Sequence, residues 1–93
     1  MARVTKSQMD AMAARFLKAR RALGLDAEVE RIAVSAGSEL YGNSTIVTTY
    51  KEDYKIVQQK RLSRSFTRAY DELRMATMTL EDLRWDLDRK GRP

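Results

Sequence analysis

The chain contains no cysteine and no histidine, and it has only one proline among its 93 residues. The absence of cysteine excludes disulfide bonds and thiolate metal sites. The absence of histidine removes the commonest general base and the commonest metal ligand, which makes an enzyme less favoured. We therefore expect a non-enzymatic protein with no cofactor, no metal site and no small-molecule substrate.

Long apolar runs are also missing. None approaches the ~20 residues of a membrane-spanning helix, and the first residues lack the apolar core of a signal peptide. Hydrophobic residues make up 43% of the chain and charged residues 33%, which is typical of a folded soluble protein. We expect one cytoplasmic domain over residues 1–93 with no membrane partner. So small a domain is marginally stable, which favours a homodimer.

The first quarter of the chain has the apolar spacing of a helix. Steps of three and four residues separate Met9, Met12, Phe16, Ala19 and Leu23. This spacing predicts a helix over about 7–23 with one apolar face. Thr5 or Ser7 can cap its start, and Gly24 can end it in a left-handed conformation.

The middle of the chain favours extended structure. Strands are expected at about 29–36, 44–50 and 54–59 because these stretches are rich in β-branched residues. The first stretch also fits helical spacing, so helix stays an alternative there. The polar residues 51–53 separate the second and third stretches, which predicts a β-hairpin. The alternative is that the last helix already begins at Lys51.

The last third of the chain carries a regular apolar seam. Its members are Leu62, Phe66, Ala69, Leu73, Ala76, Leu80, Leu83 and Leu87. The repeated spacing of four and three predicts an amphipathic helix over about 62–89. Residues 62–87 alone would span about 39 Å, longer than a compact domain of this size. Either the helix breaks near Thr79, which can cap a new start, or its far end packs on something else. We favour one long helix.

These elements predict an α+β fold: an N-terminal helix, a small antiparallel sheet of two or three strands, and a long C-terminal amphipathic helix. The apolar faces of the two helices are expected to pack on each other or on the sheet.

Three residues of the last helix lie away from the seam: Met75, Met78 and Trp85. If the seam packs inside the protein, these side chains are exposed. An exposed strip of two methionines and a tryptophan is typical of an interaction surface. The alternative is scattered surface residues with no role. We expect a protein-binding module that contacts a partner or a second copy through these residues.

The net charge of +5 raises the possibility of a nucleic-acid partner. Lys60, Arg61, Arg64 and Arg68 precede and open the predicted last helix. The three arginines would share one helical stripe, and a helix N-terminus with such a stripe can bind phosphate. The alternative is a solvated face that balances acidic residues downstream. Nucleic-acid binding is therefore the alternative function.

Three short stretches resemble small, mostly uncharacterised proteins of actinobacteriophages. They are Gly37-Ser38-Glu39-Leu40-Tyr41-Gly42-Asn43, Thr67-Arg68-Ala69-Tyr70-Asp71-Glu72-Leu73 and Thr79-Leu80-Glu81-Asp82-Leu83. The resemblance implies a phage accessory protein, made in the host bacterial cytoplasm and acting on a host or phage partner. It implies no catalytic residues. The predicted order of elements also resembles that of double-stranded-RNA-binding domains, in topology alone.

Overall fold

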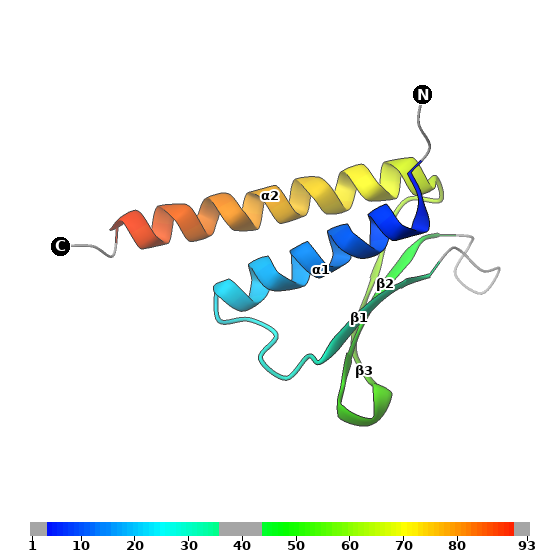
Figure 1. Ribbon diagram of the computed structural model, residues 1–93, viewed down its shortest axis with the longest axis horizontal. Coiled ribbons are helices and arrows are strands. Elements are labelled where there is room, and N and C mark those ends of the chain that lie inside the picture. Colours follow the sequence, from blue (N-terminus) through cyan, green and yellow to red (C-terminus); the bar gives the residue numbers. More distant parts are fainter. Residues whose placement is uncertain (1–3, 36–43, 91–93) are drawn as a thin grey trace.

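The computed structural model describes residues 4–35 and 44–90 (Figure 1). Within these residues the elements follow one another as α1 (Lys6–Ala22), β1 (Arg31–Ser35), β2 (Ile46–Lys51), the 3₁₀ turn η2 (Glu52–Tyr54), β3 (Lys55–Arg61) and α2 (Phe66–Lys90). The predicted α+β fold is confirmed, including the antiparallel sheet and the long last helix. The sequence stretch 37–43 that carries part of the phage resemblance lies outside the described residues.

α1 begins and ends at the predicted signals. The Thr5 hydroxyl accepts a hydrogen bond from the Gln8 backbone N–H at 3.1 Å, and the Gln8 side chain accepts one from Thr5 at 2.8 Å. This capping box makes Thr5 the cap. At the other end Gly24 has φ +80°, and its N–H and that of Leu25 donate to carbonyls of the last helical turn. The predicted glycine stop is therefore confirmed.

The sheet has the order β1-β2-β3, with antiparallel neighbours. Val34 of β1 pairs with Val47 of β2, which pairs in turn with Lys60 of β3. The predicted hairpin is confirmed, and its turn is η2, where Asp53 adopts φ 64°. The expectation of a strand at 29–36 is confirmed at Arg31–Ser35, while residue 36 lies outside the described residues.

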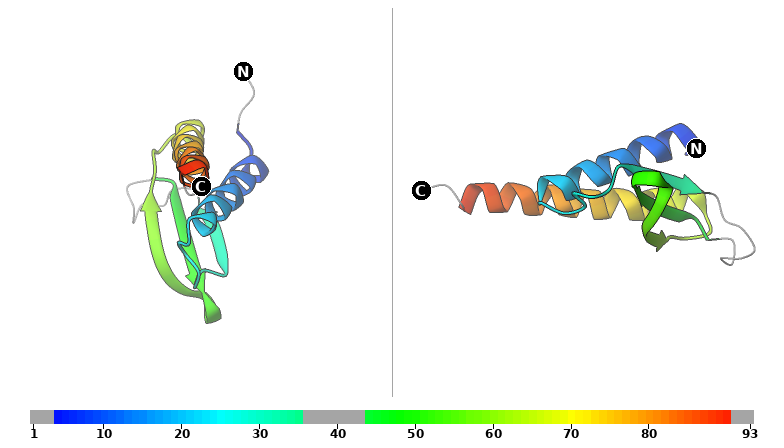
Figure 2. Two further views of the ribbon diagram at one scale, coloured as in Figure 1. Left: turned by 90° about the vertical axis from the view of Figure 1, so that its left-hand side faces the viewer. Right: turned by 90° about the horizontal axis from the view of Figure 1, so that it is seen from below.

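The core lies between the sheet and the two helices. α2 lies along α1, both helices run in the same direction, and α1 covers one face of the sheet (Figures 1 and 2). The core combines one face of α1, the inner residues of the sheet and the first half of the seam; its buried members are Met9, Met12, Ala13, Phe16, Val34, Val47, Leu62, Ala69 and Leu73. The expected packing of the two apolar helical faces is thus present.

The start of α2 differs from the expectation of a helix from about residue 62. Leu62 is extended: its N–H donates to the Thr45 carbonyl at 2.7 Å, and the Thr45 N–H donates to the Ser63 carbonyl at 3.2 Å. The helix begins at Phe66, and the Ser65 hydroxyl accepts from the Arg68 N–H at 3.4 Å. Leu62 is still buried, because it enters the core from the end of the sheet.

α2 continues through Thr79 without a break. The Thr77 hydroxyl donates to the Leu73 carbonyl at 2.7 Å, and the Thr79 hydroxyl donates to the Met75 carbonyl at 2.9 Å. Threonines inside a helix satisfy their hydroxyls in this way. The 25-residue helix spans about 37 Å and runs on past the end of α1 (Figure 1).

Candidate interaction surfaces on α2 and β3

The seam on α2 is divided into a buried and an exposed part. Ala69 and Leu73 are fully buried, whereas Leu83 and Leu87 are 47% and 53% exposed. α1 ends at Ala22, whose carbonyl accepts a hydrogen bond from the Arg84 guanidinium. The last two turns of α2 therefore present seam residues that α1 is too short to cover.

Met75, Met78 and Trp85, the apolar strip, lie on the opposite side of α2. Met75 is 57% exposed, Met78 40% and Trp85 67%. Their position off the seam correctly predicts this exposure; their role in binding stays a prediction. With Leu83 and Leu87 they bring five exposed large apolar side chains to the second half of one helix. The spacing of the seam did not reveal that its own last two leucines join this set.

A bidentate ion pair fixes the second half of α2 against α1. The Arg15 guanidinium donates to the Glu81 carboxylate through Nε at 2.9 Å and through a terminal nitrogen at 2.5 Å. The hydrogen bond from Arg15 lowers the pKa of Glu81, and the same bond raises the pKa of Arg15. This pair links the second half of α2 to α1.

The four basic residues predicted to bind phosphate are all exposed, but they do not form a helical stripe. Lys60 and Arg61 end β3, Arg64 lies in the connection that follows, and Arg68 is in the first turn of α2. The expected stripe is wrong because α2 starts four residues later than the spacing indicated. Within the described residues none of the four forms an ion pair, so the β3–α2 junction is a basic surface.

An acidic group next to this basic surface offsets part of its positive charge. The Ser65 hydroxyl caps α2, and the Glu72 carboxylate accepts a hydrogen bond from the Ser63 N–H at 2.9 Å. Hydrogen bonding from Ser63, supported by the charges of Arg68 and Lys60, lowers the pKa of Glu72. Glu72 therefore keeps its negative charge close to the basic residues.

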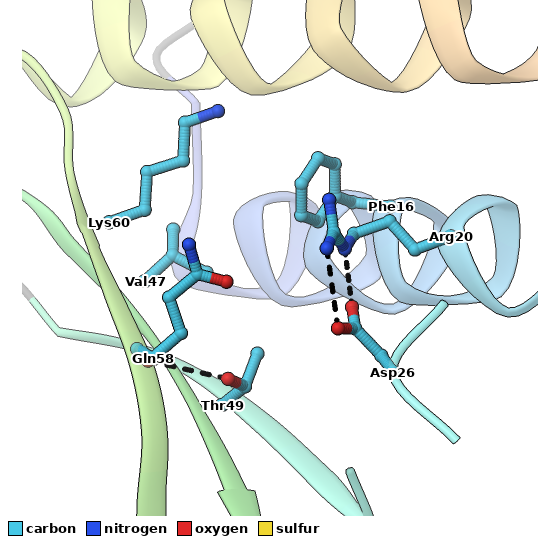
Figure 3. Close-up of a pocket in the computed structure, with 7 residues that line it drawn as sticks. All are labelled: Phe16, Arg20, Asp26, Val47, Thr49, Gln58 and Lys60. Atoms are coloured by element: carbon cyan, nitrogen blue, oxygen red, sulfur yellow. Dashed lines mark hydrogen bonds and ion pairs between the residues drawn. The ribbon is translucent and has the colours of Figure 1, made fainter. Parts of the chain in front are cut away.

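A small cavity lies between α1 and the strands β2 and β3 (Figure 3). The cationic groups of Arg20 and Lys60 lie 5.8 and 5.4 Å from the centre of the Phe16 ring, and Arg20 is also paired with Asp26. The cavity volume is about 70 Å³. Sites for small molecules measure roughly 300–1,000 Å³, so this cavity holds a few waters at most.

No group of three or more acidic side chains that could hold a metal ion occurs in residues 4–35 and 44–90. None of the helices in the same residues is long and apolar enough to cross a membrane.

Comparison with known proteins gives no match: no protein-family model fits the chain, and no curated protein or solved structure is significantly similar to it.

Proposed function

We propose that the protein is a small non-enzymatic protein-binding module that acts through the second half of α2. The observation that supports this proposal is the concentration of exposed apolar side chains there: Met75, Met78, Leu83, Trp85 and Leu87. The phage resemblance adds the expectation of a host or phage partner in a bacterial cytoplasm.

The energetic reason is the hydrophobic effect. Full burial of one large apolar side chain contributes about 1.5–3 kcal/mol relative to leaving it in water. Interfaces are enriched in methionine and tryptophan, and buried tryptophans often dominate their binding energy. Trp85 is therefore the residue expected to contribute most to binding.

The test compares Trp85→Ala with Tyr54→Ala, since Tyr54 is 69% exposed but lies at the hairpin turn. The immobilised protein is exposed to bacterial host lysate, and its own mass is measured in solution at rising concentration. We expect Trp85→Ala to weaken association with a partner or a second copy at least tenfold, and Tyr54→Ala to leave it unchanged. A protein that stays monomeric at high concentration and captures no specific partner would contradict the proposal.

Nucleic-acid binding is the second candidate, favoured by the unpaired, exposed cations of the β3–α2 junction. A gel-shift titration with duplex and single-stranded DNA and RNA tests it. Real phosphate contacts weaken steeply with salt, and each lost contact reduces the slope of log K against log salt by about one. Arg64→Gln should lower the affinity, whereas Lys18→Gln, on exposed α1 surface, should not. The absence of any shift at low salt would eliminate this candidate.

A further inference from the structure

The apolar strip belongs to a second regular stripe on α2. Asp71, Met75, Met78, Asp82, Trp85 and Arg89 follow one another at spacings of four and three residues. Each of these side chains is exposed. The same spacing puts them on one helical face, as in the seam. We call these six residues the outer stripe; Arg74 and Asp86 flank it.

The outer stripe is arranged symmetrically about the level of Leu80. Asp71 and Arg89 lie nine residues on either side of Leu80, and Arg74 and Asp86 lie six residues on either side. In both cases one member is acidic and the other basic. Met75 and Trp85 are likewise placed five residues before and after this level. Rotation about a two-fold axis therefore brings Asp71 opposite Arg89 and Met75 opposite Trp85, whereas Arg74 and Asp86 lie on opposite flanks of the stripe and Asp82 falls opposite Met78.

We propose that the outer stripe is a homodimer interface in which two copies of α2 pair antiparallel about a two-fold axis level with Leu80. In this register Asp71 faces Arg89 of the second copy, and Met75 packs on its Trp85. Met78 and Asp82 are the residues nearest the axis. The inference rests on the proposed function and names the partner as a second copy of this chain.

The charges select the antiparallel arrangement. In a parallel pair the central residues of the stripe face their own copies, so Asp71 meets Asp71 and Arg89 meets Arg89, and like charges repel. In the antiparallel pair Asp71 of each copy instead faces Arg89 of the other, and the same patch of both copies meets in an isologous interface. Each end of the contact then holds one facing pair of opposite charges.

The existing contacts leave these charges free to pair across the dimer. Asp71 and Arg74 are 3.8 Å apart and Asp86 and Arg89 are 3.7 Å apart within the helix. Such long, exposed pairs contribute little to stability by themselves. α1 packs on a different face of α2, where Ala69, Leu73 and Thr77 are buried. It therefore leaves the outer stripe accessible along its roughly 27 Å between residues 71 and 89.

Two charge-swapped proteins test the register. One carries Asp71→Arg with Arg74→Asp, and the other carries Asp86→Arg with Arg89→Asp. Both keep the net charge and an acid–base pair within the helix. Each protein alone places like charges at both contacts between positions 71 and 89, whereas a mixture of the two restores two opposite-charge contacts.

Sedimentation and native mass measurements give the result, with circular dichroism to confirm folding. We expect the wild type to dimerise, each swapped protein alone to dimerise at least about tenfold more weakly, and the equimolar mixture to form a one-to-one heterodimer. Equal dimerisation of the swapped proteins, or a mixture that fails to recover, would overturn the proposed register. A monomeric wild type would overturn the dimer itself.

Failure of the dimer and failure of the proposed function are distinguishable. A monomer that captures a protein through Trp85 overturns the dimer and leaves the protein-binding function standing. A monomer that captures nothing overturns both.

Discussion

Gly24 determines how the chain leaves α1, since its φ of +80° is a conformation that other residues adopt only at a cost. A Cβ built at this position meets no atom within 4 Å, so the cost of a side chain is conformational alone. We expect Gly24→Ala to lower the free energy of unfolding by about 1 kcal/mol. Urea unfolding measures this change. Gly24→Asn should lose less, because asparagine tolerates this conformation, and an unchanged stability in Gly24→Ala would contradict the argument.

The Arg15–Glu81 pair makes stability depend on acid pH. The pair lowers the pKa of Glu81 in the folded state below its ordinary value of 4.5. Its contribution is therefore complete above the unfolded-state pKa and disappears as the pH falls through the lowered folded-state pKa. We expect the free energy of unfolding to fall less steeply with acid in Glu81→Gln than in the wild type. Urea unfolding between about pH 2 and pH 6 measures both slopes.

A control separates the pair from carboxylates in general. Arg15→Met should flatten the acid slope as much as Glu81→Gln does, and the double variant should show no further flattening. Additive effects of the two changes would mean that the pKa of Glu81 is lowered by some other group.

The contact between Arg15 and Glu81 could not be predicted from the sequence. Arg15 and Glu81 are separated by 66 positions, and neither lies on the apolar spacing of its helix. Their contact depends on the rotation of α1 and α2 about their axes, which hydrophobic spacing fixes only coarsely. Local signals were more informative, because Thr5 and Gly24 act within a few residues of their own positions.

At the scale of the element, apolar spacing predicts a helix better than it predicts the ends of that helix. Leu62 fits the seam but belongs to extended chain, because a side chain can reach the same core from a strand end. Ser65 marks the true start through its capping bond to Arg68. The basic residues therefore share no helical stripe, because Lys60, Arg61 and Arg64 precede the first residue of α2.

Because the first half of the seam is buried and its end is exposed, the same leucine-to-alanine substitution should affect stability very differently at the two ends of α2. Leu73→Ala removes a fully buried side chain and should lower the free energy of unfolding by about 2–5 kcal/mol. Leu87→Ala alters a side chain that is 53% exposed beyond the end of α1. This substitution should change the free energy of unfolding by less than about 0.5 kcal/mol. Urea unfolding of both variants at low protein concentration measures the difference. A large loss in Leu87→Ala would mean that something covers the last two turns even in the monomer.

At the scale of the whole molecule, the sequence predicts which helices and strands form but not how the two helices pack against each other. The fold class follows from two helical spacings and one hairpin, each of which is local. The mismatch between a 17-residue α1 and a 25-residue α2 emerges only when the two lie side by side (Figure 2). That mismatch exposes Leu83 and Leu87, and the rotation of α2 against α1 turns the outer stripe outward.

An outer stripe buried between two copies couples dimerisation to folding. Because the dimer dissociates when the chain unfolds, mass action should raise the wild-type Tm as the protein concentration rises from about 10 µM to about 1 mM. The protein with Asp71→Arg and Arg74→Asp should show a Tm independent of concentration over this range. Calorimetry of the wild type and the charge-swapped protein at low and high salt gives a second test. Salt screens the exposed charge pairs, so it should reduce the concentration-dependent rise in Tm of the wild type. A rise of equal size in the charge-swapped protein would place the self-association on another face, and the exposed Leu83 and Leu87 would then be the residues to substitute next.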